Sequence, residues 1–221
     1  CDIALETLRK KMVQYTILAE IPPSPWNHSY MVALTHDVDV IAIRKSSFKS
    51  VGVAAFRCFF QGHFKEGAGI VLAKFGIAQD PWNLFNRWKE IENGLQVRST
   101  FYFVPRNDDA GISSHPYRAV HYNLDLSLIR NLISEGWEAG VHGIDNWIDP
   151  ARGKEELHAL HLEETGNRTH WLLFDRQSPV NLDRAGYAYD STFGYNDDVG
   201  FRAGTTQVYQ PEGVFRLLEL P

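Results

Sequence analysis

The chain has 221 residues, of which 44% are hydrophobic and 22% charged, and this is the composition of an ordinary globular protein that can bury a sizeable core. Its formal net charge of −5 provides no basic surface and argues against nucleic acid as the main partner. The two cysteines, Cys1 and Cys58, are too few for a disulfide framework, and without a C-x-x-C motif a thiolate zinc knuckle is excluded. No apolar run reaches transmembrane length, and no signal-peptide pattern is present.

The predicted elements alternate between strands and helices. In the first half, residues 31–39 (MVALTHDVD) and 97–105 (VRSTFYFVP) are expected to be strands, and residues 45–95 between them contain helix-like patches. In the second half we expect helices at 123–136, 153–166 and 180–186 and strands at 137–143, 168–174, 187–195 and 214–221.

This repetition predicts an α/β protein with a parallel sheet, either open or closed into a barrel. No internal repeat or low-complexity linker interrupts it. We therefore predict a single domain over residues 1–221, with a helical elaboration at about 40–95.

We interpret both ends of the chain as trimmed. The chain begins with Cys1 rather than Met, and its last apolar segment, 214–221, resembles a core strand with nothing after it. A Cys-Asp start is also found in processed lipoproteins, but here the helix-like run at 4–15 follows without a flexible tether. We therefore expect a truncation at the C-terminus and a cytoplasmic protein, with a periplasmic protein or a lipoprotein anchored at Cys1 as alternatives.

Two carboxylates stand at the tip of the first strand. Side chains alternate along a strand, so Asp37 and Asp39 share a face while His36 and Val38 occupy the other. In parallel α/β folds, functional groups gather at the carboxyl ends of strands. Two acids this close repel unless a cation or a base lies between them, so one could bind a metal while the other takes a proton. The alternative is that one of them caps the following loop.

A histidine ends another apolar strand. His142 stands at the tip of EAGVHG, and imidazole together with carboxylate suits zinc and similar ions. A third segment, NRTHWLLF, places Arg168 and His170 on one face, at the start of their predicted strand rather than at its end.

In this order, the motifs THDVD, STFYFVP and EAGVHG resemble those of the NodB-homology polysaccharide deacetylases, carbohydrate esterase family 4. The resemblance covers the chain from about residue 30 to the end and implies a deformed (β/α) barrel of about seven strands. The further pattern at 189–205, YDSTFGYNDDVGFRAGT, is similar to a subset of deacetylase-like proteins found near surface-polysaccharide and O-antigen biosynthesis genes.

The resemblance implies a metal-dependent hydrolase that removes an acetyl group, preferably N-acetyl, from a polysaccharide or its sugar precursor. Asp37 matches the catalytic base, and Asp39 and His142 match ligands of a divalent ion, expected to be Zn²⁺. Asn146 stands where the family has a second histidine and is expected to bind through its amide oxygen, with His170 as the alternative ligand.

Two further roles follow from the same resemblance. Arg168 matches the arginine that orients the base. The family's late motif, which carries the general-acid histidine, is not visible before Pro221, so His170 is our candidate for the general acid.

Sugar contacts are expected from Arg202, which lies among glycines, and from Trp147, which lies in a polar loop after His142. The alternative for Arg202 is a solvated surface turn. Other aromatics could form a stacking wall, although most are expected in the core. They are Trp137, Trp171, Tyr187, Tyr189 and Tyr195.

Two other functions compete with the deacetylase. A catalytically inactive member of the same fold could bind a glycan or a biosynthetic partner, and Asn146 together with the missing late motif favours this. A metal-dependent amidohydrolase of small cyclic amides would share the fold and the Asp-x-Asp motif. A long open groove would indicate a polymer, and a closed pocket a small substrate.

Overall fold

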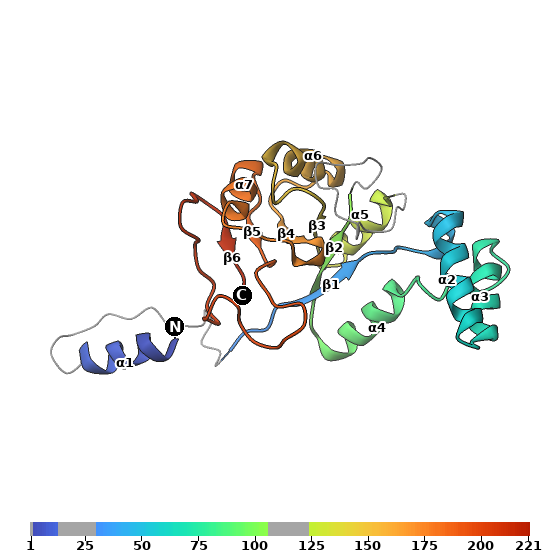
Figure 1. The fold of residues 1–221 in the computed structure, drawn as a ribbon, viewed down its shortest axis with the longest axis horizontal. Coiled ribbons are helices and arrows are strands. Elements are labelled where there is room, and N and C mark those ends of the chain that lie inside the picture. The colour runs from blue at the N-terminus through green and yellow to red at the C-terminus, as the bar shows by residue number, and fades with distance from the viewer. Residues whose placement is uncertain (1, 13–29, 106–123) are drawn as a thin grey trace.

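The computed structural model describes residues 2–12, 30–105 and 124–221. Six strands in this part of the chain form one sheet, and every adjacent pair is parallel (Figure 1). Their spatial order is their order in the sequence: β1 (Leu34–Val38), β2 (Ser99–Phe103), β3 (Glu138–Gly143), β4 (Gly166–Thr169), β5 (Tyr189–Asp190) and β6 (Leu218–Glu219). The predicted parallel α/β sheet is confirmed.

The sheet curls without closing. Over the described residues, β1 and β6 form no ladder with each other. Leu34 and Thr35 of β1 nevertheless line the same cavity as Leu220 and Pro221, which directly follow β6. The described residues therefore form a curled, open sheet of six strands; among them, neither closure nor the seventh strand of the expected deformed (β/α) barrel is found.

The helices begin and end where capping chemistry allows. Asp125 precedes α5 and accepts hydrogen bonds from the backbone of Ser127 and Leu128, and Asp149 caps α6 in the same way. The helices are α1 (Asp2–Met12), α2 (Phe48–Phe60), α3 (Phe64–Lys74), α4 (Phe85–Leu95), α5 (Leu126–Ser134), α6 (Pro150–Leu160) and α7 (Ser178–Ala185), with short 3₁₀ turns η2 (Ile43–Lys45) and η3 (His170–Leu172). No helix in the described ranges is long and apolar enough to cross a bilayer.

The two faces of the sheet differ in chemistry because side chains alternate along each strand. Phe101, Phe103 and Val141 point into the main core, which the helices cover. The residues between them, such as Tyr102 and His142, point to the opposite, concave side and line cavities there. The alternation predicted for β1 is confirmed, since Val38 is in the core and Asp37 lines a cavity.

One predicted boundary was wrong in a way that matters for the site. The strand expected at 168–174 is β4, which ends at Thr169. The chain then turns through Trp171 and Leu172, whose φ angles of 61° and 49° are incompatible with a strand. Arg168 therefore lies near the carboxyl end of its strand, and His170 directly after it.

Other elements are shorter than expected. The helix predicted at 153–166 is α6, which starts earlier because Pro150 suits a first helical turn and ends where His161 adopts a left-handed conformation. The strands predicted at 187–195 and 214–221 shrink to the two-residue strands β5 and β6.

Candidate metal centre and active site

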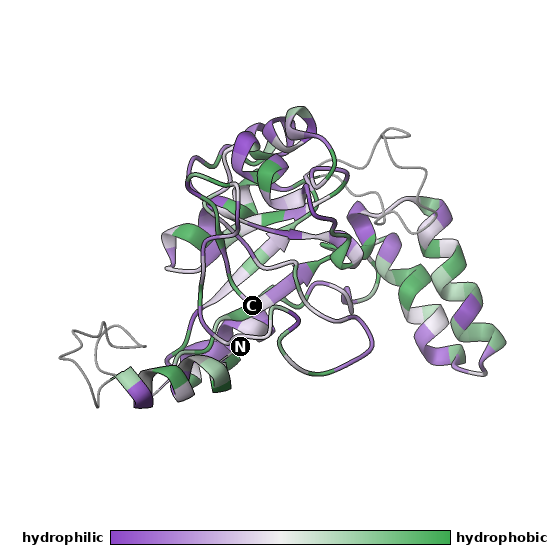
Figure 2. Ribbon diagram, turned by 60° about the vertical axis from the view of Figure 1, so that its left-hand side comes forward, coloured by the Kyte–Doolittle hydropathy of each residue, from purple (hydrophilic) through white to green (hydrophobic). Residues whose placement is uncertain are grey.

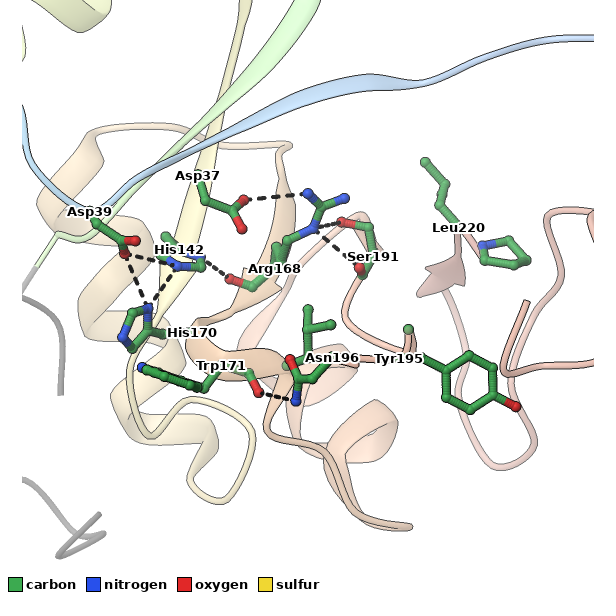
Figure 3. Close-up of a pocket in the computed structure, with 13 residues that line it drawn as sticks. Asp37, Asp39, His142, Arg168, His170, Trp171, Ser191, Tyr195, Asn196 and Leu220 are labelled. Carbon is green, nitrogen blue, oxygen red and sulfur yellow. Dashed lines mark hydrogen bonds and ion pairs between the residues drawn. The ribbon is translucent and has the colours of Figure 1, made fainter. Parts of the chain in front are cut away.

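Five polar side chains meet at the carboxyl ends of three strands of the sheet, β1, β3 and β4 (Figure 3). Asp37 and Asp39 come from the end of β1, His142 comes from β3, and Arg168 and His170 come from β4 and the turn after it. They line a cavity of about 480 Å³, a volume within the range of small-molecule sites. The sheet topology thus unites residues that lie more than a hundred positions apart in the sequence.

Three of these side chains present metal-ligating atoms to one another. Asp39 Oδ1 lies 3.4 Å from His142 Nε2 and 3.2 Å from His170 Nδ1. The two ring nitrogens are 2.9 Å apart. Zinc bonds of 2.0–2.1 Å in tetrahedral geometry separate neighbouring donors by about 3.3 Å, so this triangle has the size of one face of such a site. Three protein ligands of N and O type are also typical of catalytic zinc.

The tautomer of His142 is fixed by the backbone. Its Nδ1 lies 2.8 Å from the carbonyl oxygen of Arg168, and because a carbonyl only accepts, Nδ1 must carry the proton. With Nδ1 committed to this carbonyl, Nε2 is the ring nitrogen that points toward Asp39 and His170. A metal-ligating histidine is commonly oriented in this way by its second nitrogen.

Asp39 is held in its ionised form. Its partial burial acts to raise the pKa, but the hydrogen bonds and charges of His142 and His170 outweigh burial and hold the pKa of Asp39 well below its usual range. The carboxylate is therefore ready to bind a cation at any physiological pH.

Arg168 links Asp37 to the rest of the site. Its Nη1 lies 3.4 Å from Asp37 Oδ1 and donates to Thr35 Oγ1 at 2.6 Å. Its Nε lies 3.2 Å from Ser191 Oγ, and the guanidinium stacks 5.1 Å from the ring centre of Tyr102. These contacts fix the guanidinium, which in turn positions a half-exposed Asp37 beside the three ligating groups.

Asn146 lies outside this cluster. It is fully buried, and its amide nitrogen donates to Asn167 Oδ1 at 2.7 Å and to the Tyr187 hydroxyl at 3.1 Å. Its oxygen lies 3.4 Å from Thr169 Oγ1. The amide is therefore committed to a buried network, and the structure favours His170 over Asn146 as the third ligand.

The same geometry changes the role expected for His170. Its Nδ1 faces Asp39 and His142, so a ligand role competes with the general-acid role. The sequence placed His170 on the right segment, but the incorrect strand boundary hid its position beside the other ligands.

The two residues expected to contact sugar do not line the cavity. Trp147 is half-buried in the loop after β3. Arg202 is exposed and packs 4.6 Å from the ring centre of Phe193, with Nη1 3.4 Å from the carbonyl of Gly194. Arg202 therefore contacts the segment that forms a wall of the cavity.

Other aromatic side chains line the cavity instead of Trp147. Trp171 and Tyr195 line the cavity and are each 48% exposed, whereas Trp137 and Tyr187 are in the core, as expected. Ser191, which holds Arg168, was missed because a serine in a loop carries no distinguishing sequence signal.

No protein-family model matches the chain, and no curated protein sequence matches it. Among solved structures, the chain is similar to a protein from Mycobacterium smegmatis that is described as a candidate polysaccharide deacetylase, with a TM-score of 0.47 and 20% sequence identity. The match covers 93% of this chain and 63% of that protein.

Proposed function

We propose that this chain is a metal-dependent carbohydrate deacetylase that hydrolyses an acetyl group, preferably N-acetyl, from a sugar or polysaccharide. The observation that carries the proposal is the convergence of Asp39, His142 and His170 on one point, next to an Asp37 held by Arg168. The resemblance of the THDVD and EAGVHG motifs to the NodB-homology deacetylases supports it, and we regard the curled sheet as part of the deformed barrel of that family.

The proposed ligands of the ion, expected to be Zn²⁺, are Asp39, His142 and His170. A divalent ion held there would lower the pKa of water and polarise the acetyl carbonyl. The chain contributes preorganisation, since the Arg168 carbonyl fixes His142 and the two histidines keep Asp39 ionised.

Asp37 is the proposed general base. It takes one proton from the attacking water, and Arg168 holds it in place while it does so. The same proton can then pass from Asp37 to the nitrogen of the leaving amine, so that one water yields acetate and a free amine. Because Asp37 then serves as both base and acid, His170 is not needed as the general acid and can bind the metal.

The exposed aromatics suggest how a sugar is held. Trp171 and Tyr195 offer ring faces at the cavity, and sugar rings pack against such surfaces. The rim is open because Asp39, Trp171 and Tyr195 are all exposed, which suits a sugar within a longer chain better than a small enclosed amide. The similarity at 189–205 favours a surface polysaccharide or its precursor.

The proposal is tested by acetate release from N-acetylglucosamine oligomers. The full chain would be stripped with a chelator, assayed, reloaded with Zn²⁺ and assayed again, with bound metal measured by elemental analysis. We expect about one ion per chain and activity only in the loaded protein. Asp37→Asn should retain the ion and lose activity.

Asp149→Asn is the matched control, because asparagine caps a helix as well as aspartate does and Asp149 lies outside the cavity. If Asp37→Asn kept full activity, Asp37 would not be the base. If the loaded protein released no acetate but bound the oligomers, the inactive glycan-binding alternative would replace the deacetylase.

A further inference from the structure

Helices α2 and α3 form a hairpin at one end of the molecule, beyond α4 and α5 (Figure 1). The two helices pack against each other through a small core of their own. Val51 and Ala55 of α2 meet Ile70 and Ala73 of α3 in this core, with Ile43 beneath them. Gly67 allows the close contact, since a Cβ there would lie 2.7 Å from the ring of Phe59.

The faces that point away from this core are apolar as well. On α2, Val53, Phe56 and Phe60 recur at helical spacing opposite Val51 and Ala55, and they are 47%, 68% and 84% exposed. On α3 and directly after it, Phe64, Leu72 and Phe75 lie opposite Ile70 and are also exposed. We call these six outward residues the hairpin surface.

A surface helix of a globular protein normally turns polar residues to solvent. Here the outward faces of two adjacent helices are rich in phenylalanine, and the colouring of Figure 2 shows apolar residues along both. None of the described residues covers the hairpin surface, since all six side chains are exposed. Across the two helices, the exposed rings of Phe59 and Phe64 lie 6.2 Å apart and those of Phe48 and Phe75 lie 6.4 Å apart, and exposed apolar surface of this kind marks an interaction site.

The charge of the hairpin is opposite to that of the chain. Residues 48–75 contain four cationic side chains, Lys49, Arg57, Lys65 and Lys74, and a single acidic one, Glu66, whereas the whole chain carries −5. Lys49 and Arg57 are exposed on α2, and Lys65 is exposed on α3. Cations therefore surround the phenylalanines on both helices.

We propose that the hairpin surface binds an anionic lipid bilayer. Phenylalanine and leucine side chains between lysines and arginines are the composition of helices that lie at the boundary of headgroups and acyl chains. Each cation near an anionic bilayer strengthens binding by about fivefold. A second copy of the chain fits less well, because two such surfaces would bring like charges together.

This interaction does not depend on the proposed hydrolase activity. If both hold, the site would act on acetylated sugars borne at a membrane, a consequence that rests on the proposed function. Binding itself is measured without any assay of catalysis, so a failure of one proposal leaves the other intact.

The test is sedimentation of the full chain with vesicles of phosphatidylglycerol and phosphatidylcholine, compared with vesicles of phosphatidylcholine alone. We expect binding to the anionic vesicles and its loss at high salt. A double variant with Phe56→Ser and Phe60→Ser should reduce binding about tenfold or more. A second, with Lys49→Gln and Lys65→Gln, should reduce it about 25-fold.

Phe215→Ser is the matched control, because Phe215 is 89% exposed and lies outside the hairpin. Circular dichroism and gel filtration would show that all variants remain folded. Binding that is absent from anionic vesicles, or unchanged in both double variants, overturns the proposal. So does self-association of the chain that is lost in the phenylalanine variant while no vesicles are bound.

Discussion

A buried carboxyl behind the site should make stability depend on pH. Glu219 of β6 is fully buried, accepts a hydrogen bond from the backbone of Phe193 at 3.2 Å, and stands in register with the equally buried Asp190 of β5. Burial, reinforced by the charge of Asp190, raises the pKa of Glu219 from 4.5 to about 9. The folded chain therefore keeps a proton that the unfolded chain releases above pH 4.5.

The sign and size of the effect follow from this difference. Between these two pKa values the native state binds more protons than the unfolded state, so the free energy of unfolding falls as pH rises, by about 1.4 kcal/mol per pH unit. From pH 5.5 to 7.5 the loss due to Glu219 is about 2.5 kcal/mol, or roughly 5–10 °C in Tm for a chain of this size. Glu219→Gln cannot ionise and can still accept from Phe193, so this loss should disappear.

The measurement is denaturant or thermal unfolding of the wild type and of Glu219→Gln at several pH values in that interval. The two curves should converge at low pH and separate as pH rises, with the variant the more stable at pH 7.5. The exposed Glu163 provides the control, and Glu163→Gln should follow the wild type throughout. A constant difference between Glu219→Gln and wild type across the interval would mean that Glu219 is already ionised in the folded protein.

Three further substitutions probe the site and its support. Arg168→Lys keeps the positive charge but loses the planar guanidinium that reaches Thr35, Asp37 and Ser191. The kcat for acetate release should therefore fall about 100-fold or more, while elemental analysis should find the metal retained. Gly143→Ala places a Cβ 2.0 Å from the amide of Asn146 and should cost about 3 kcal/mol in unfolding free energy, whereas Gly52→Ala, with open space around it, should be neutral or stabilising. Trp171→Gly should raise KM for an acetylated oligosaccharide about 2–10-fold, because it removes a stacking face. The Tm should stay nearly unchanged, because glycine readily adopts the φ of 61° found at this position. An unchanged KM would exclude Trp171 from substrate binding.

The sequence was sufficient for the sheet and for most of its strand tips. β1, β2 and β3 carry apolar or aromatic runs with clear alternation, and their bounds lie within a few residues of those predicted. β5 and β6 were overestimated because apolar residues such as Phe215 extend beyond the ladder and are exposed. Apolar composition predicts which segments can pair, whereas the length of a strand depends on where its neighbours end.

The third ligand was harder to predict, because it depends on the backbone after a strand. An ideal strand would have continued through Trp171, and the left-handed conformation of Trp171 and Leu172 that ends it has no sequence signal such as glycine or asparagine. Asn146 was favoured because its spacing from His142 matches the family motif. Spacing alone could not show that Gly143 leaves room for the amide to fold back over the strand into the network with Asn167.

The pairing of β3 with β4 keeps the proposed metal ligand on β3 aligned with the arginine on β4 that holds the proposed base. His142 and Arg168 are register partners, and the carbonyl of Arg168 accepts a hydrogen bond from His142 Nδ1 while its guanidinium reaches Asp37. Arg168 thus orients the proposed ligand His142 through its backbone carbonyl and the proposed base Asp37 through its side chain. Because substitution changes only the side chain, variants at position 168 should separate the two functions: metal binding persists while proton transfer fails. A variant of Arg168 that lost metal and activity together would show that the side chain, and not the ladder, holds His142 in place.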